Sequence, residues 1–369
     1  MNLKYILSPC GTSLLTNQTQ NNKERNLVFK YANEKTKNDI PDADKVQLEQ
    51  LISKTSALID TADYQEAIKM SAEINGIIKI YDGSISQNND FHFLLSTDTW
   101  LGEETAKLVE KWLKSKNKNL ITLVHRHTDL QTKDISAFQL SLSELIKKFS
   151  EELPAYKDNG YKIIFNLTGG FKSVQGFLQS IANFFADETV YIFESSSELM
   201  KIPRLPIRMD AINIIEENLI SFRNIAINLP VSSFENIPET FLFTLEGETT
   251  FSPWGELIWS KSKSEIYKKR VFPSPNPKKI QFGHLFEKNI KSLTADRVEI
   301  INNRIDQLNK HLTDQSYNPV SLDFKALKGK AMEPSTHEMD AWADLDAKRI
   351  FGHFEGDIFL LDKLDKGLH

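Results

Sequence analysis

The segment Asn166-Leu167-Thr168-Gly169-Gly170-Phe171-Lys172-Ser173 joins a short apolar run, Tyr161 to Leu167, to a segment with helical spacing, Phe171 to Phe185. This pattern predicts a buried strand that leads through a tight loop into a helix. Adjacent glycines let the backbone approach a ligand closely, and the first turn of a helix offers unpaired N–H donors. Lys172 adds a positive charge, so we expect an anion-binding loop, although a plain strand-to-helix turn would use the same glycines.

Further apolar runs of strand length alternate with helical segments in the first part of the chain. Strands that alternate with helices predict an α/β fold with a mostly parallel sheet covered on both faces. Ligands of such sheets bind beyond the carboxyl ends of the strands, where the loop 166–173 lies. The other strands are predicted at Leu3–Leu7, Phe91–Ser96, Leu120–His125 and Thr189–Glu194, and the other helices at Thr105–Leu113 and Ile135–Phe149.

Two more loops rich in small hydroxyl residues follow predicted strands, at 8–13 and at 96–99. Each hydroxyl cluster also suits an ordinary helix N-cap. Because the carboxyl ends of parallel strands meet at one edge, we expect all three loops to converge there. The predicted binding residues are Ser8, Pro9, Cys10, Gly11, Thr12, Ser96, Thr97, Asp98, Thr168, Gly169, Gly170 and Lys172.

The composition limits the class of protein. The 369 residues carry a formal charge of -5, which predicts no bulk attraction to nucleic acid or to an anionic membrane. Cys10 is the one cysteine, so an intramolecular disulfide and a multi-cysteine zinc site are excluded and a reducing compartment is indicated. No stretch approaches the roughly 18 apolar residues that cross a bilayer. We expect a cytoplasmic protein with no membrane partner.

The second part of the chain separates its charges. Residues 261–330 hold 15 Lys or Arg against 7 Asp or Glu, whereas residues 331–369 hold 4 against 9. Apolar residues from Val298 to Leu312 repeat at three- and four-residue spacing, which predicts an amphipathic helix in the basic segment. A further helix is predicted at Ala211–Ile225, between two proline-bearing stretches. The expected domains are 1–229, a linker or docking segment at 230–277, and 278–369.

The chain ends in a predicted hairpin, Lys348 to Lys366, whose turn is Gly356-Asp357. A two-residue turn pairs Glu355 with Ile358. Side chains then alternate, so that Ile350, Phe354, Phe359 and Leu361 share a core face with Lys363. Arg349 and His353 share the opposite, open face, which is available for chemistry.

The loops 8–13 and 166–172, together with Leu94 to Thr99, resemble the CRISPR-associated Rossmann-like (CARF) sensor domain. The resemblance covers roughly Met1 to Ile227. It implies a Rossmann-like sensor that forms a homodimer and binds a cyclic oligoadenylate across its two-fold axis, with the four-membered ring favoured. Two symmetric anion-binding loops suit a cyclic ligand with several phosphates. Such sensors switch on an attached effector.

The run Leu322 to Lys330, the Arg349/His353 hairpin and the ending Lys366 to His369 resemble the RelE family of mRNA interferases. In that family two helices precede a small antiparallel sheet that carries Lys, Arg and a terminal Tyr or His. The resemblance covers about 278–369. It implies cleavage of mRNA on the ribosome. Taken together, the two resemblances predict an ancillary ribonuclease of type III CRISPR defence. This chain departs from the family by its lack of a terminal tyrosine, by Phe324 at an expected leucine, and by the acidic stretch Glu338 to Asp344.

RNA cleavage by the neighbouring 2'-hydroxyl needs a base for its proton, cations for the developing phosphorane and an acid for the 5'-oxygen. We expect Arg349 to stabilise charge and Lys328 or Lys330 to act as base or phosphate contact. His353 or His369 is the expected acid. No metal is required, and an ordinary solvated face would also use these lysines. The predicted catalytic residues are Lys325, Lys328, Lys330, Arg349, His353 and His369.

Three other functions remain open. Arg304 and His311, seven residues apart on the amphipathic helix, fit the spacing of a HEPN ribonuclease. The same basic helix suits a winged-helix transcription regulator that enters a DNA groove. A metal-dependent nuclease would use the acids Asp340, Asp344 and Asp346, which we expect to form a solvated loop instead.

Overall fold

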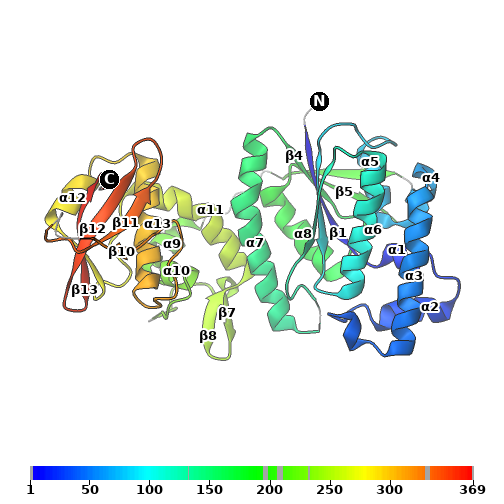
Figure 1. Ribbon diagram of the computed structural model, residues 1–369, viewed down its shortest axis with the longest axis horizontal. Helices are drawn as coiled ribbons and strands as arrows, with labels where there is room; N and C mark the ends of the chain where they lie inside the picture. The colour runs from blue at the N-terminus through cyan, green and yellow to red at the C-terminus, as the bar shows by residue number, and fades with distance from the viewer. Residues whose placement is uncertain are drawn as a thin grey trace. The chain divides into compact units, whose positions relative to one another are not determined.

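The chain forms two compact units, residues 1–208 and residues 209–369. Figure 1 draws the first unit from blue to green and the second from green to red. No helix in the described part of the chain combines the length and apolar character needed to cross a bilayer. The computed structural model describes residues 3–131, 133–193, 198–205, 211–231, 233–328 and 333–367.

The first unit is built on a six-stranded sheet with the order β3-β2-β1-β4-β5-β6. Five strands are parallel, which confirms the predicted α/β sheet and its five strands. The sequence does not predict the antiparallel edge strand β6, because its half-exposed residues end in a proline and form no apolar run. The strands are β1 (Lys4–Cys10), β2 (Phe91–Ser96), β3 (Ile121–Arg126), β4 (Lys162–Asn166), β5 (Glu188–Ile192) and β6 (Leu199–Pro203).

Helices cover both faces of this sheet (Figure 1). On one face Phe149 of α7 packs against Phe93 and Phe165, and on the other α1 to α6 pack over Ile6 and Leu94. The three predicted helices are confirmed as α6, α7 and α8, whereas the five α-helices and the 3-10 helix between β1 and β2 are not predicted by the sequence. The helices are α1 (Ser13–Thr16), α2 (Asn22–Lys30), η1 (Lys37–Asp39), α3 (Asp42–Thr61), α4 (Tyr64–Met70), α5 (Ala72–Ile80), α6 (Trp100–Lys116), α7 (Ile135–Asp158) and α8 (Lys172–Phe185).

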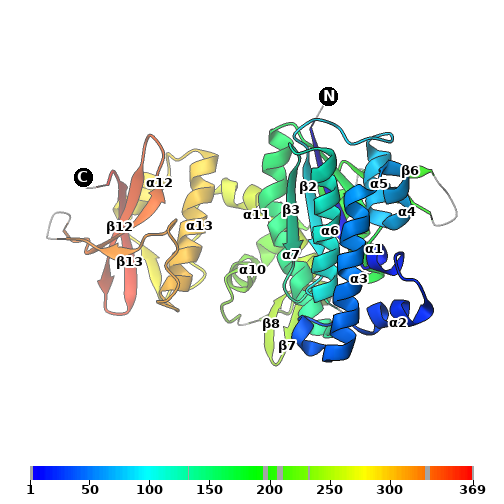
Figure 2. The same ribbon diagram turned by 45° about the vertical axis from the view of Figure 1, so that its right-hand side comes forward.

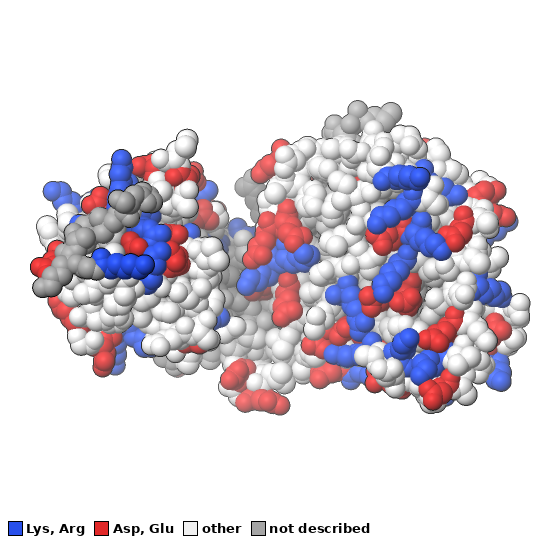
Figure 3. Space-filling view, viewed as in Figure 1, with Lys and Arg blue, Asp and Glu red and all other residues white. Residues whose placement is uncertain are grey.

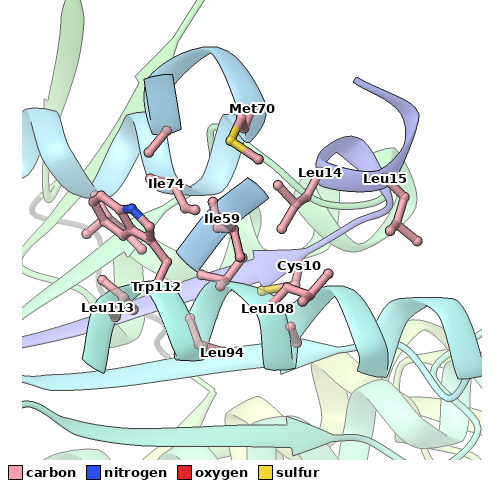
Figure 4. Close-up of a cluster of buried hydrophobic side chains, with 14 of the residues drawn as sticks. Cys10, Leu14, Leu15, Ile59, Met70, Ile74, Leu94, Leu108, Trp112 and Leu113 are labelled. Atoms are coloured by element: carbon pink, nitrogen blue, oxygen red, sulfur yellow. The ribbon is translucent and has the colours of Figure 1, made fainter. Parts of the chain in front are cut away.

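Cys10 belongs to the core of the first unit. Figure 4 shows its sulfur among apolar side chains that include Ile59, Leu94 and Leu108. The residue is 1% exposed, and burial raises the pKa of its thiol far above the ordinary value. The thiol of Cys10 therefore belongs to the core, and a binding role for this side chain is not supported.

The second unit begins with α9 and α10 rather than after residue 229. These helices cover the predicted helix at 211–225, and they share a core with the segment 230–277, in which Phe222 packs on Phe251 and Trp259. The segment expected as a linker is thus an ordered layer of this unit. Its elements are α9 (Ile212–Glu217), α10 (Leu219–Ala226), η2 (Glu239–Phe241), β7 (Leu242–Leu245), β8 (Glu248–Phe251) and α11 (Pro253–Lys269).

The remainder of the second unit is a five-stranded sheet with two helices. The order is β10-β11-β12-β13-β9, antiparallel except that β9 runs parallel to β13. Asp340 lies in the strand β11 and not in a solvated loop, because Met339 and Ala341 alternate with the acids and are buried. Asp344 and Asp346 lie in the exposed loop between β11 and β12, as expected. The elements are β9 (Ile280–Phe282), α12 (His284–Ile290), α13 (Ala295–His311), β10 (Lys325–Ala326), β11 (His337–Trp342), β12 (Lys348–Glu355) and β13 (Ile358–Asp365).

The terminal hairpin is confirmed as β12 and β13, with Glu355 paired to Ile358 across a turn at Gly356. The register shifts between Phe351 and Gly352, so that Asp362 has no partner of its own on β12. A bulge of this kind reverses the side-chain alternation beyond it. Lys363 therefore faces the ring of Phe351 instead of the core, and its predicted core position is wrong.

The helix α13 is covered on two sides within the second unit. Ile301, Ile305 and Leu308 pack in the core of the β10–β13 sheet, beside which α13 lies in Figure 2. On its other side Asp306 binds the buried Arg223 of α10 and the hydroxyl of Tyr267 on α11. A helix covered in this way has no free face with which to enter a DNA groove.

Candidate functional site

The predicted binding loops meet where the strand order of the first sheet reverses. β1 has β2 on one side and β4 on the other, so the loops after β1 and β4 flank this switch point. A Cβ atom built on Gly11 would lie 3.2 Å from the Cα of Gly170. The two loops are thus in backbone contact, as the sequence predicts.

A buried carboxylate that the sequence analysis does not identify lies beneath these loops. Glu73, near the start of α5, accepts hydrogen bonds from the Gly11 amide (3.0 Å) and from the hydroxyls of Ser13 and Ser71 (2.7 Å each). A Cβ on Gly169 would lie 2.3 Å from this side chain. Glu73 therefore ties α5 to both loops, and only glycine fits at position 169.

The inner wall of the site is a polar network from β1 and β4. Asn166 donates hydrogen bonds of 3.1 Å to the Ser8 hydroxyl and to the Glu73 carbonyl, and it accepts a hydrogen bond from the Thr168 amide. Ser8 is fully buried, so it supports the loop rather than facing a ligand. The Thr168 hydroxyl oxygen is buried and makes no hydrogen bond within the described residues.

The outer part of the site carries the free positive charge. Lys172 is exposed at the first residue of α8, and it forms no ion pair within the residues that the structure describes. No side chain caps the N-terminus of α8. Gly170 has φ +103°, and a Cβ atom built at this position would lie 2.8 Å from the Cβ of Pro9. The arrangement suits a phosphate-bearing ligand.

The loop after β2 does not join this site. Ser96, Thr97 and Asp98 are all buried, and Thr97 hydrogen-bonds the N-cap residue Thr99. Asp98 binds Arg126 at 2.8 Å and Lys35 at 3.1 Å. The predicted ligand role of these three residues is not supported, because their polar groups are already satisfied by the fold. Thr12 precedes α1 beside Gly11 and is partly exposed.

In the second unit, three carboxylates surround Arg349. Its guanidinium lies 2.9 Å from Asp340 and 3.2 Å from Asp323, and its Nη1 lies 2.8 Å from Glu338 in an ion pair whose N–H direction does not suit a hydrogen bond. Lys325 also binds Asp323, and this lysine, followed by Arg349, lowers the pKa of Asp323. The expected cationic face is therefore balanced by acids.

His353 lies on the same face of the sheet and is held by a carboxylate. Its Nδ1 lies 2.9 and 3.0 Å from the two carboxylate oxygens of Asp362, and the Ser335 hydroxyl donates to that carboxylate over 2.7 Å. Asp362, and more weakly Glu355, raise the pKa of His353 against the opposing effect of partial burial. Asp362 reaches this face because it lies two residues beyond Leu360, which pairs with His353.

The remaining catalytic candidates are placed only in part. Lys328 is exposed after β10. Lys330 and His369 lie outside the described residues. In Figure 3, Lys and Arg side chains lie next to Asp and Glu side chains on this unit, in keeping with the paired charges around Arg349.

The alternative pair Arg304 and His311 is occupied by backbone contacts. Arg304 donates to the carbonyls of Asp340 and Ala341, and burial lowers the pKa of Arg304. His311 Nδ1 lies 2.8 Å from the Tyr317 carbonyl. Both residues lie on a helix that packs on a five-stranded sheet, which is not the all-helical surrounding expected for a HEPN nuclease. They fasten α13 to β11 and to the loop that follows the helix.

A family model described as CRISPR-associated protein (Cas_APE2256) matches residues 68–205. No curated protein matches the chain. Among solved structures, the chain is similar to Enterococcus italicus Csm6 bound to cyclic hexa-2'-fluoro-hexa-dAMP, with 13% identity and a TM-score of 0.32. The match covers 84% of this chain and 62% of the Csm6 chain, so this chain spans less than two thirds of the length of that protein. The family match falls within the first unit, from α4 to the end of β6, and includes Glu73 and the loop after β4.

Proposed function

We propose that the protein is a ribonuclease of CRISPR defence that a cyclic oligoadenylate switches on. The first unit is the sensor, and the second unit is a RelE-like nuclease that cleaves mRNA on the ribosome. The protein acts as a homodimer, with one anion-binding loop of each subunit facing the shared ligand. The favoured activator is cyclic tetra-adenylate.

The observation that carries this proposal is the site between the loops after β1 and β4. The start of α8, which no side chain caps, together with the exposed Lys172 and the close-packed glycines, suits a phosphate better than a neutral ligand. A single such site is small. Two copies related by a two-fold axis would hold the phosphates of a symmetric ring. The family match over 68–205 supports the same assignment.

The nuclease assignment draws on the architecture of the second unit. Two helices, α12 and α13, precede the antiparallel strands β10 to β13, as the RelE resemblance implies. Arg349 and His353 lie four residues apart on β12, on the side of the sheet away from Ile350 and Phe359. The helix α13 is covered on both sides, so it is not available to enter a DNA groove, which argues against the transcription regulator.

In the proposed reaction the 2'-oxygen attacks the adjacent phosphorus and the 5'-oxygen leaves. Arg349 would stabilise the phosphorane once RNA competes with its carboxylate partners. Lys325 and Lys328 would contact the phosphate, and Lys328 or Lys330 would act as the base. His353 supplies an acid, for which His369 is the alternative. These roles need no metal ion.

The test uses the full chain with translating ribosomes and each cyclic oligoadenylate in turn, and maps the ends of the cleaved mRNA. We expect ring-dependent cleavage that persists in EDTA on a naked RNA reporter and leaves a cyclic phosphate. Lys172→Ala should weaken ligand binding in calorimetry, while Lys118→Ala should not, because that exposed lysine precedes β3 at the opposite edge of the sheet. Equal affinity of both variants would refute the sensor site, and absence of cleavage with every ring would refute the nuclease.

A further inference from the structure

Ser335, Asp362 and His353 form a hydrogen-bonded row on the open face of the second sheet. The Ser335 hydroxyl donates to Asp362, and both oxygens of Asp362 lie within 3.0 Å of His353 Nδ1. The side chains of Asp362 and His353 are 11% and 17% exposed. The row comes from three separate segments, and the alternation of β13 from Leu360, the partner of His353, puts Asp362 on the same face of the sheet as His353.

We infer that Asp362 positions His353 as the general acid of the proposed ribonuclease, with Ser335 fixing the orientation of the carboxylate. The inference rests on the proposed function and names which residue protonates the leaving group. Asp362 acts through His353, so it is a positioning residue. His353 is the catalytic residue.

The geometry fixes which nitrogen does the chemistry. With the Nδ1–H donated to Asp362, Nε2 is the atom that carries the exchangeable proton. In the reaction the 2'-oxygen forms its bond to phosphorus and gives up its proton to the base. The bond from phosphorus to the 5'-oxygen breaks as His353 Nε2 transfers its proton to that oxygen. The neutral imidazole then regains a proton from water.

The surroundings of His353 favour its protonated form. Asp362 faces the ring from β13 and Glu355 from β12, and both favour the imidazolium, while Ser335 is neutral. Glu355 lies 3.4 Å from Nε2 and is well exposed, so it can yield to RNA. A general acid must be protonated when the leaving group departs, and Asp362 and Glu355 both favour the protonated form of His353.

The other described histidines of the second unit lack this arrangement. His311 is bound to a backbone carbonyl, and His337 packs among Phe324, Phe354 and Phe359. Burial lowers the pKa of His337. His284 begins α12. Among these described histidines, His353 alone has a carboxylate within hydrogen-bond distance of its ring.

The test compares two RNA substrates, one with the normal 5'-oxygen and one with sulfur in its place at the cleaved bond. Each is presented to the activated full chain both free and as the mRNA of a programmed ribosome. A thiolate leaves without protonation, so loss of the acid should matter only for the oxygen substrate. His353→Asn should lower cleavage of the oxygen substrate by about 10²–10⁴-fold and leave the sulfur substrate nearly unaffected.

A second measurement tests the pairing of Asp362 with His353 without relying on cleavage alone. The NMR signal of His353 is assigned by its absence in His353→Asn. In Asp362→Asn the titration midpoint of this signal should move to lower pH. The alkaline limb of the pH profile of cleavage should move in the same direction. Asp365→Asn is the matched control, because that exposed carboxylate of the same strand pairs with Lys363. Ser335→Ala should give a smaller shift in the same direction.

The outcomes distinguish the two claims. Equal loss of both substrates in His353→Asn, or no loss of either, overturns this inference while the nuclease assignment stands. An unchanged His353 titration in Asp362→Asn overturns the positioning role of Asp362. A wild-type protein that cuts neither RNA under any activator refutes the proposed function, and the acid role of His353 falls with it.

Discussion

Removal of Arg349 should destabilise the second unit, because its guanidinium neutralises three carboxylates at once. Glu338, Asp340 and Asp323 lie 2.8, 2.9 and 3.2 Å from it, and their side chains are 13%, 22% and 39% exposed. In Arg349→Ala the three acids remain close together, with Lys325 beside Asp323 and Glu338 and with Arg304 near Asp340. Like charges at such separations repel, and water screens them only in part.

The expected loss of stability lies between that of an exposed and that of a buried ion pair. Breaking a buried pair costs about 3–5 kcal/mol, and an exposed pair is worth less than about 1 kcal/mol, so we expect about 2–3 kcal/mol for this half-buried cluster. For a unit of this size that corresponds to a fall of about 4–12 °C in the unfolding midpoint. Thermal denaturation followed by circular dichroism measures it.

Two further variants make the reasoning refutable. Arg270→Ala is the matched control, because Arg270 is exposed and stacks on Phe272 without a carboxylate partner among the described residues. Asp340→Asn placed in the Arg349→Ala background should restore part of the lost stability by removing one repelling charge. An unchanged midpoint in Arg349→Ala, or a further fall on adding Asp340→Asn, would show that the cluster does not depend on the arginine charge.

Three more outcomes follow from the buried and strained groups. Glu73→Ala removes the acceptor of three hydrogen bonds, so it should cost the first unit about 2–4 kcal/mol and speed hydrogen exchange at the Gly11 amide, unlike Glu144→Ala at an exposed site on α7. Gly170→Ala, at φ +103° and against Pro9, should lower both stability in urea titrations and affinity for the ring, whereas Gly176→Ala, with open space around it, should not. Because the folded protein raises the pKa of His353, the stabilisation from its pair with Asp362 is fully present below the ordinary value of 6.5 and is lost as the pH rises through the raised value. Unfolding measured across this range should show the gap between the wild-type protein and Asp362→Asn closing toward alkaline pH, and a gap that widens there would contradict the assignment.

The five parallel strands of the first sheet were predictable because the pattern that marks each of them is local. Each is a short apolar run closed by a turn, and β4 leads into Gly169 and Gly170 at once. Glu73 was not predictable on the same grounds. Its partners Gly11 and Ser13 are 62 and 60 residues away in sequence, and a glutamate in the first turn of a helix is an ordinary residue when seen alone.

The second unit shows which local patterns mislead. Glu338, Met339, Asp340 and Ala341 alternate polar and apolar side chains, which is the pattern of a half-buried strand, yet the density of acids favours a loop. Lys363 was assigned to the core by counting from the turn, and a single extra residue at Asp362 reverses that count. Nothing in the sequence beside Asp362 marks the bulge, because it depends on pairing with β12.

The glycines around the first site restrict how this chain can vary. A Cβ at position 11 would crowd Gly170, one at 170 would strike Pro9, and one at 76 would lie 2.1 Å from the Asn166 amide oxygen. None of these neighbours is the loose end of a flexible side chain. In related chains that keep the site, we therefore expect positions 11, 76 and 170 to stay small together, and an exchange at position 166 to accompany any larger residue at 76. The space available for a Cβ atom limits which residues these positions accept. They should therefore resist change even in relatives whose ligand-facing residues have diverged.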